Sequence, residues 1–89
     1  MDSSITYPYG IPFYADLDFI TLYFQNNDTR PFNIHFYEKR KIGNLAGIVF
    51  PKEKKKYQFP EGSKVVILTD KGKAHCYIKL QSNWTYIYP

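Results

Sequence analysis

Two histidines and one cysteine, His35, His75 and Cys76, are the residues best suited to metal binding or nucleophilic chemistry. A metal site needs three or four converging ligands, and the sequence has no HxH, CxxC or HExxH spacing. His75 and Cys76 are neighbours in a segment with strand character, so their side chains should point to opposite faces. We therefore predict no metal site and no cofactor, and interpret both histidines as partly exposed strand residues.

Catalytic groups are equally hard to assemble. Cys76 shares its strand phase with Ile78 and Leu80, which predicts a buried, unreactive thiol. Asp16 and Asp18 are two positions apart, whereas paired catalytic carboxylates usually face each other across a cleft. Because the chain also has no GxSxG, Walker A or GxGxxG motif, we predict a protein that is not an enzyme, with no catalytic residues.

The basic side chains gather in two clusters, which are Lys39, Arg40, Lys41 and Lys54, Lys55, Lys56. We expect both clusters in turns, with a basic loop over residues 39–46 and a charged turn over residues 52–56. Lysines in such places keep sheet edges soluble, or they attract an anionic partner such as nucleic acid or an acidic protein face. The net charge of +4 is uneven, since residues 39–89 hold eleven of the twelve basic side chains. The molecule should therefore have a basic side.

A second candidate surface comes from the side chains that the strand phase directs outward. We expect them to form an aromatic and basic face made of Tyr23, His35, Tyr37, His75, Tyr77 and Lys79. Protein interfaces are enriched in tyrosine, and single-stranded nucleic acids stack their bases on such faces.

Strands must position these side chains, because helical periodicity is nearly absent. Residues 18–25 and 32–38 alternate apolar and polar residues around a polar turn, which predicts a hairpin with Ile20, Leu22, Phe24, Phe32, Ile34 and Phe36 in the core. Further strands are expected at 47–50, 57–59, 64–69, 74–81 and 84–88, with a tight turn at Gly72. The run at 65–68 should be covered on both faces.

We therefore predict an all-β fold without significant helix, a single antiparallel β-sandwich of about six or seven short strands, either Ig-like or prealbumin-like. Its 89 residues suit one domain, 1–89. Residues 1–17 should form an extended N-terminal arm that packs on this domain.

Three segments resemble the von Hippel–Lindau β-domain type. They are ITLYFQNNDTRPFNIHF at 20–36, GIVFPKE at 47–53 and VVILTD at 65–70, followed by Gly72. The resemblance covers residues 18–81 and implies a β-sandwich that binds proteins. His35 stands where that family has a tryptophan, and Lys64 and Val66 fall near its other pocket positions. Hydroxyproline recognition is therefore not implied.

We expect a non-enzymatic binding module whose partner is a protein. Binding to a carbohydrate or a nucleic acid on the same face is one alternative, and self-association through edge strands is another. A single cysteine and an N-terminus without an apolar segment predict a cytoplasmic protein, with secretion by a non-standard route left open. No apolar run approaches the ~20 residues of a membrane span, so we expect no membrane insertion.

Overall fold

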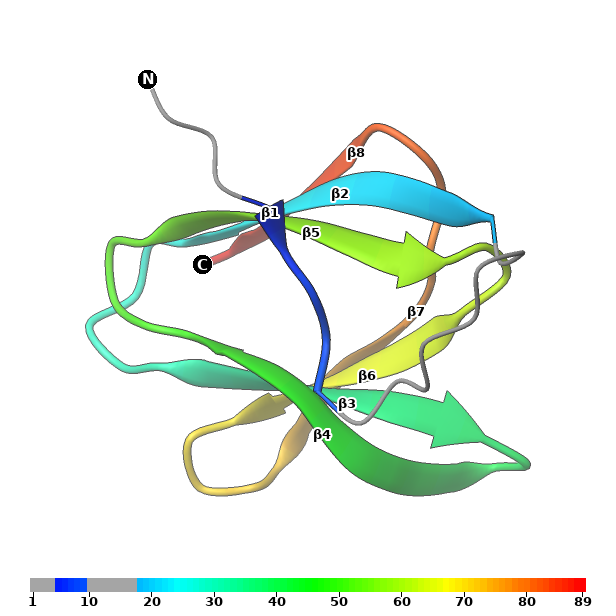
Figure 1. Ribbon diagram of the computed structural model, residues 1–89. Helices are drawn as coiled ribbons and strands as arrows, with labels where there is room; N and C mark the ends of the chain where they lie inside the picture. The colour runs from blue at the N-terminus through cyan, green and yellow to red at the C-terminus, as the bar shows by residue number, and fades with distance from the viewer. Residues whose placement is uncertain (1–4, 10–17) are drawn as a thin grey trace.

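The computed structural model describes residues 5–9 and 18–89, which form eight strands and no helix (Figure 1). The strands are β1 (Ile5–Thr6), β2 (Phe19–Asn26), β3 (Phe32–Glu38), β4 (Lys41–Val49), β5 (Lys54–Pro60), β6 (Lys64–Thr69), β7 (Ala74–Lys79) and β8 (Trp84–Tyr88). The all-β prediction is confirmed. The expected count of six or seven was too low, because β1 has only two residues and shows no periodicity.

The strands form two four-stranded sheets, which pack face to face over one core. The order β4-β3-β6-β7 is fully antiparallel, and we call it the antiparallel sheet. The order β1-β5-β2-β8 is the mixed sheet, since β1 runs parallel to β5 and β8 runs parallel to β2. The prediction of a purely antiparallel fold was therefore wrong. Side chains alternate in the same way in both kinds of pairing, so the sequence pattern does not distinguish them.

The expected hairpin at Ile20–Glu38 is also corrected. β2 and β3 do not pair, because β2 lies in the mixed sheet and β3 in the antiparallel sheet. The turn between them crosses from one layer to the other. Both strands still direct one apolar face into the shared core, so a hairpin and this crossing produce the same sequence alternation.

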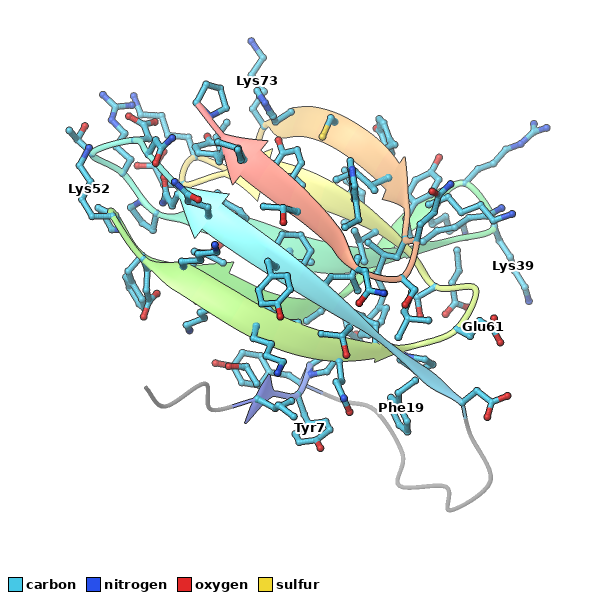
Figure 2. The ribbon with its side chains drawn as sticks, turned by 90° about the horizontal axis from the view of Figure 1, so that it is seen from above. Tyr7, Phe19, Lys39, Lys52, Glu61 and Lys73 are labelled. Carbon is cyan, nitrogen blue, oxygen red and sulfur yellow. The ribbon has the colours of Figure 1, made fainter. Side chains whose placement is uncertain are left out.

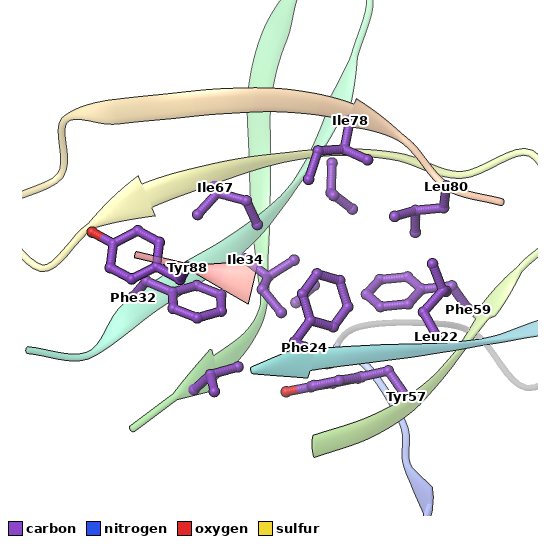
Figure 3. Close-up of a cluster of buried hydrophobic side chains, with 13 residues drawn as sticks. Leu22, Phe24, Phe32, Ile34, Tyr57, Phe59, Ile67, Ile78, Leu80 and Tyr88 are labelled. Atoms are coloured by element: carbon purple, nitrogen blue, oxygen red, sulfur yellow. The ribbon is translucent and has the colours of Figure 1, made fainter. Parts of the chain in front are cut away.

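The core lies between the sheets and is rich in aromatic rings (Figure 3). The predicted inward residues are confirmed, since Leu22, Phe24, Phe32 and Ile34 are buried, and Ile20 and Phe36 pack against them half-buried. The closest ring pair joins Phe32 to Tyr88, with centroids 4.6 Å apart. All four residues from Val65 to Leu68 are buried, as the uninterrupted apolar run predicted. Seven of the chain's residues are phenylalanine and nine are tyrosine, so few positions are needed to fill this core.

Gly47 allows β4 and the Tyr57 ring to approach each other. A Cβ atom at position 47 would lie 2.8 Å from Cζ of Tyr57 and nearer still to its hydroxyl oxygen. Tyr57 is buried, and burial is the main reason why its pKa is raised to about 12. The absence of a side chain at position 47 is therefore a packing requirement.

Two strands begin earlier than the sequence predicted. β4 starts at Lys41, inside the expected basic loop, and β5 starts at Lys54, inside the expected charged turn. The first four residues of β4 are all exposed, so they carry no apolar alternation. Register shifts on either side of His35 add to the irregularity. Backbone pairing with β3, rather than burial, defines this part of β4.

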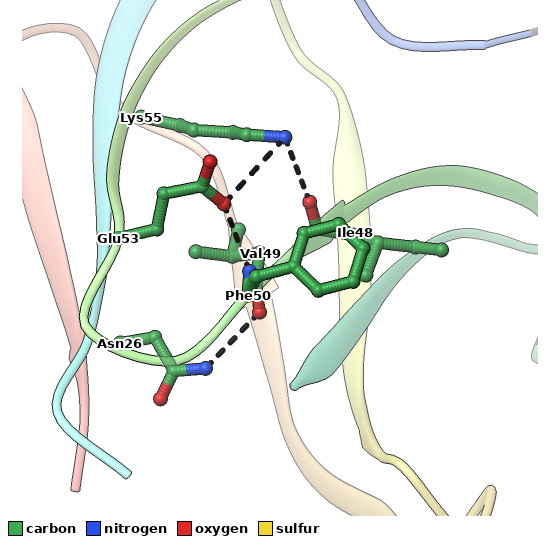
Figure 4. A network of polar contacts seen from close by, with 6 residues as sticks. All are labelled: Asn26, Ile48, Val49, Phe50, Glu53 and Lys55. Carbon is green, nitrogen blue, oxygen red and sulfur yellow. Dashed lines mark hydrogen bonds and ion pairs between the residues drawn. The ribbon is translucent and has the colours of Figure 1, made fainter. Parts of the chain in front are cut away.

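Asn26 joins three segments, which are the end of β2, the β2–β3 turn and the end of β4. Figure 4 shows its bond to Val49. Its side-chain amide donates to the carbonyl oxygens of Arg30 and Val49, at 2.8 and 3.0 Å, and its Oδ1 accepts from the backbone N–H of Asp28 at 2.8 Å. Nearby, the Lys55 ammonium donates to the Ile48 carbonyl oxygen at 3.0 Å and so links the two sheets. Asn26 is fully buried, and each of its polar side-chain atoms has a partner.

Residues 5–9 lie against the body of the fold. Besides the pairing of β1 with β5, the Tyr9 N–H donates to the Ala46 carbonyl oxygen at 2.9 Å. The Tyr7 ring meets Phe19 edge-on, with centroids 6.4 Å apart. The remaining residues of the expected arm, 1–4 and 10–17, lie outside the described residues, and Asp16 is among them.

Candidate functional site

The predicted aromatic and basic face is divided between the two outer surfaces of the molecule. Tyr23 lies on β2 in the mixed sheet, whereas the other predicted residues lie on β3 and β7 in the antiparallel sheet. Outward therefore means opposite directions for Tyr23 and Tyr37. The Tyr23 ring has the Lys54 ammonium 5.6 Å from its centre, so this ring already has a cationic neighbour.

The outer side of the antiparallel sheet brings together His35, Tyr37, Val66, Tyr77 and Lys79, which we call the tyrosine face. The register places His35, Val66 and Tyr77 in one row. The rings of Tyr37 and Tyr77 meet edge-to-face, 4.8 Å apart. Val66 lies in this row and is fully buried, although it is not part of the core cluster between the sheets. Tyr77 itself is 59% exposed, which leaves one free ring surface.

The two histidines have different surroundings. The His35 Nδ1 lies 3.0 Å from the Gly43 carbonyl oxygen and bridges the irregular part of the β3–β4 pairing. A register shift opposite β6 moves His75 out of line with Tyr77, and the His75 ring lies 5.1 Å from the Tyr88 ring. His75 is therefore at the side where β7 meets β8, away from the tyrosine face.

Next to the tyrosine face, the fold forms an open groove of about 960 Å³. It lies where the β3–β4 turn faces the β5–β6 turn, and Tyr37 belongs to both the groove and the tyrosine face. Its lining consists of Phe36, Tyr37, Glu38, Lys39, Arg40, Lys41, Ile42, Gly43, Asn44, Pro60, Gly62, Ser63 and Lys64. Figure 2 shows Lys39 and Glu61 at this end of the molecule and Lys52 at the opposite end.

The groove is cationic. Lys39, Arg40, Lys41 and Lys64 line it, against the single acidic residue Glu38. Within residues 5–9 and 18–89, the one ion pair joins Lys55 to Glu53, so none of the four groove cations is neutralised by such a contact. Apolar side chains of Phe36, Ile42 and Pro60 complete the lining. A ligand with negative charge and some apolar surface would match this combination.

Two of the groove cations lie in the β3–β4 turn, in a backbone conformation that is unfavourable for their residue types. Lys39 and Arg40 are the two central residues of the turn, and both have positive φ, 51° and 63°. Two-residue hairpin turns of this kind favour Asn-Gly, because other residues lose free energy in the left-handed region. The turn therefore carries two long cations at positions where local backbone preferences oppose them. Such strain is typical of sites with a role beyond folding.

The second predicted basic cluster, Lys54, Lys55 and Lys56, does not line the groove. Lys54, Lys55 and Lys56 lie in β5 rather than in a turn, which corrects their predicted placement. Lys54 is near the Tyr23 ring, Lys55 bonds to the β4 backbone, and Lys56 is opposite Tyr23 in the β2–β5 register. We therefore place the candidate site at the first cluster.

The groups considered for chemistry remain apart. In the part of the chain that the structure describes, no three His, Cys, Asp or Glu side chains converge on a point. Cys76 is half-buried beside β8, where its Sγ lies 3.4 Å from the Tyr86 hydroxyl. Burial raises the pKa of Tyr86 well above its usual range, and Cys76 adds to that rise.

Of the groove residues, the sequence predicted Tyr37 and the basic turn of Lys39, Arg40 and Lys41. Lys64, Pro60 and Ser63 were missed, because they reach the groove from a turn that is about twenty positions away in the chain. No helix in the described part of the chain is long and apolar enough to span a membrane. No protein-family model, curated protein or solved structure matches the chain. Function is therefore inferred from the groove and the tyrosine face themselves.

Proposed function

We propose that this protein is a non-enzymatic binding module that holds an acidic segment of a protein partner in the basic groove and against the tyrosine face. The observation that carries this proposal is the groove's lining of four cations and one acid, continuous through Tyr37 with the exposed ring of Tyr77. The fold that presents it is, in this proposal, a β-sandwich of the Ig-like or prealbumin-like kind.

A protein segment suits the surface better than a single-stranded nucleic acid. Stacking of successive bases needs several flat, open rings. Tyr37 and Tyr77 pack edge-to-face on each other, so only Tyr77 offers a largely free ring. The concave groove with apolar walls and cationic residues instead fits side chains of mixed character, such as leucine next to glutamate.

The test is a capture experiment from a nuclease-treated extract of the native source, read by quantitative mass spectrometry. The baits are the wild type, Arg40→Glu in the groove, Tyr77→Ser on the tyrosine face, and Lys54→Glu as a control. The control makes the same charge change on the opposite layer. Each protein captured by the wild type is then purified, and its affinity for all four baits is measured by calorimetry.

The proposal predicts a purified partner whose affinity falls at least tenfold for Arg40→Glu and Tyr77→Ser and stays within twofold for Lys54→Glu. Equal losses for Arg40→Glu and Lys54→Glu would indicate only a net-charge effect and would contradict the proposed site. Capture of RNA or DNA from an untreated extract, with a steep loss of affinity in added salt, would favour the nucleic-acid alternative instead. Salt-insensitive binding of a purified glycan would favour the carbohydrate alternative.

A further inference from the structure

The two sheets have four edge strands, β1, β8, β4 and β7, and three of them carry devices that oppose pairing with another chain. β1 has only two residues. β4 is irregular where it pairs with β3, and it begins with an exposed lysine. β7 has a register shift near its start and an exposed lysine at its end. Short length, bulges and lysines are the usual means of protecting an edge.

β8 has none of these devices. Its sequence Trp84–Tyr88, WTYIY, has no charge and no proline, and its pairing with β2 runs without a register shift. Trp84 is 40% exposed and Ile87 is 54% exposed. Among the described residues, no strand pairs with β8 on the side opposite to β2. β7, in the other sheet, contacts β8 through side chains, with Cys76 at Tyr86 and His75 at Tyr88.

The backbone groups on this open side can be assigned. The Tyr88 carbonyl oxygen accepts from the Asn27 N–H at 3.0 Å, so the polar backbone groups of Tyr88 face the β2 side. These groups alternate in direction along a strand, which places those of Tyr86 and Trp84 on the same side. The N–H and C=O groups of Thr85 and Ile87 therefore face the open edge.

The sequence of β8 is suited to pairing with itself. It alternates aromatic and β-branched residues, and this order of residue types is the same in both directions. In an antiparallel pair centred on Tyr86, Thr85 lies opposite Ile87 of the second copy, and their free backbone groups form four hydrogen bonds over the two symmetric pairs. Tyr86 then lies opposite its own copy, and Trp84 lies opposite Tyr88. These are the closer, non-hydrogen-bonded positions, where aromatic pairs stabilise a sheet.

We propose that β8 is a dimerisation edge, through which a second copy of this chain extends the mixed sheet in antiparallel fashion around Tyr86. β8 itself is uncharged, so two copies of this basic chain can pair there without bringing like charges of the strand together. A two-fold arrangement also closes after two copies. No groove residue lies in β8, so this proposal is independent of the proposed function.

Sedimentation equilibrium of the purified full chain over a range of concentrations tests the proposal. The wild type is expected to move from 10.5 kDa toward twice that mass as the concentration rises. Ile87→Lys is expected to raise the dissociation constant at least tenfold, because the new charge enters the contact twice. Ile5→Lys, at an exposed isoleucine of β1 on the other edge of the mixed sheet, is the matched control and should leave the dissociation constant unchanged.

The register is tested by a charge pair. The double variant Thr85→Glu and Ile87→Lys places opposite charges across both symmetric contacts, so it should recover most of the affinity lost by Ile87→Lys. A wild type that remains a monomer up to millimolar concentration would overturn the proposal. So would a dimer that is unaffected by Ile87→Lys, or a double variant no tighter than Ile87→Lys while circular dichroism shows both folded.

Discussion

Replacing Asn26 with alanine is expected to remove about 4 kcal/mol from the free energy of unfolding. The substitution deletes three hydrogen bonds, and the one to the Val49 carbonyl oxygen is fully buried. A buried polar group left without a partner costs about 1–3 kcal/mol, and each of the two partly buried bonds contributes about 0.5–1.5 kcal/mol. The total stability of an 89-residue chain is on the order of 4–13 kcal/mol. Asn26→Ala should therefore remove roughly a third or more of the total stability.

Urea denaturation followed by circular dichroism measures this loss. With a slope near 1.5 kcal/mol per molar urea, the midpoint should fall by about 2–3 M. Asn27→Ala is the matched control, because Asn27 is exposed and, among residues 5–9 and 18–89, its side chain bonds only to the exposed amide of Gln25. It should change stability by less than about 0.5 kcal/mol. Equal effects of the two substitutions would refute the assignment of Asn26 as the residue that joins the three segments.

Asn26→Asp separates hydrogen bonding from side-chain size. The carboxylate keeps the acceptor for the Asp28 N–H but directs its second oxygen at the carbonyl oxygens of Arg30 and Val49. Burial and this repulsion should raise the pKa of the new carboxyl in the folded state. A carboxyl group whose pKa is raised in the folded state contributes stability that is present below its unfolded-state pKa. This stability is lost as pH rises toward the folded-state pKa, so the variant should approach the wild type in acid. A stability gap that does not narrow between pH 7 and pH 4 would contradict this reasoning.

Three further predictions concern Gly47, Tyr57 and the basic turn. Gly47→Ala should lower stability by about 1–3 kcal/mol through overpacking against Tyr57, and Tyr57→Phe in the same chain should recover part of this loss. A thermal melt of Gly47→Ala that is unchanged from the wild type would contradict the close approach of position 47 to the Tyr57 ring. The folded-state pKa of Tyr57 is raised to about 12 from the ordinary 10, so the neutral phenol contributes to the free energy of unfolding below pH 10, and this contribution is lost as pH rises toward 12. Urea midpoints across this range should therefore fall less steeply for Tyr57→Phe than for the wild type. Replacing Lys39 and Arg40 with Asn and Gly should raise stability by about 1–2 kcal/mol and at the same time weaken binding of the acidic partner, and a loss of stability would contradict the left-handed geometry of the turn.

The sequence predicted the buried side of each long strand well. Alternation identified Leu22, Phe24, Phe32 and Ile34 as core residues, and the turn at Gly72 is confirmed by its φ of 83° and by its N–H bond to the Thr69 carbonyl oxygen. These features depend on neighbours within a few positions. Alternation depends only on which side is buried, so it carried no information on sheet membership. For that reason the segment from Ile20 to Glu38 was interpreted as a hairpin.

The candidate site was harder to predict for the same physical reason. Lys39, Arg40 and Lys41 were identified from their charge alone, but the groove also needs the turn at Pro60–Ser63 and Lys64. Contacts between distant turns depend on the strand order, which periodicity does not contain. Tyr23 was placed with Tyr37 because outward was assumed to mean one side, and in a two-layered fold there are two.

The parallel pairing of β2 with β8 has a consequence for how the chain folds during synthesis. Leu22 pairs with Trp84, which is 62 positions later in the chain. One side of β2 therefore stays unpaired until β8 has left the ribosome. Until then Phe24 and Phe32 lack the rings of Tyr86 and Tyr88 that close the core beside them. Pairing across such a distance is slow, on the order of milliseconds to seconds for folds of this kind. The emerging chain therefore passes through a stage with an exposed strand edge, during which a chaperone would protect it from aggregation.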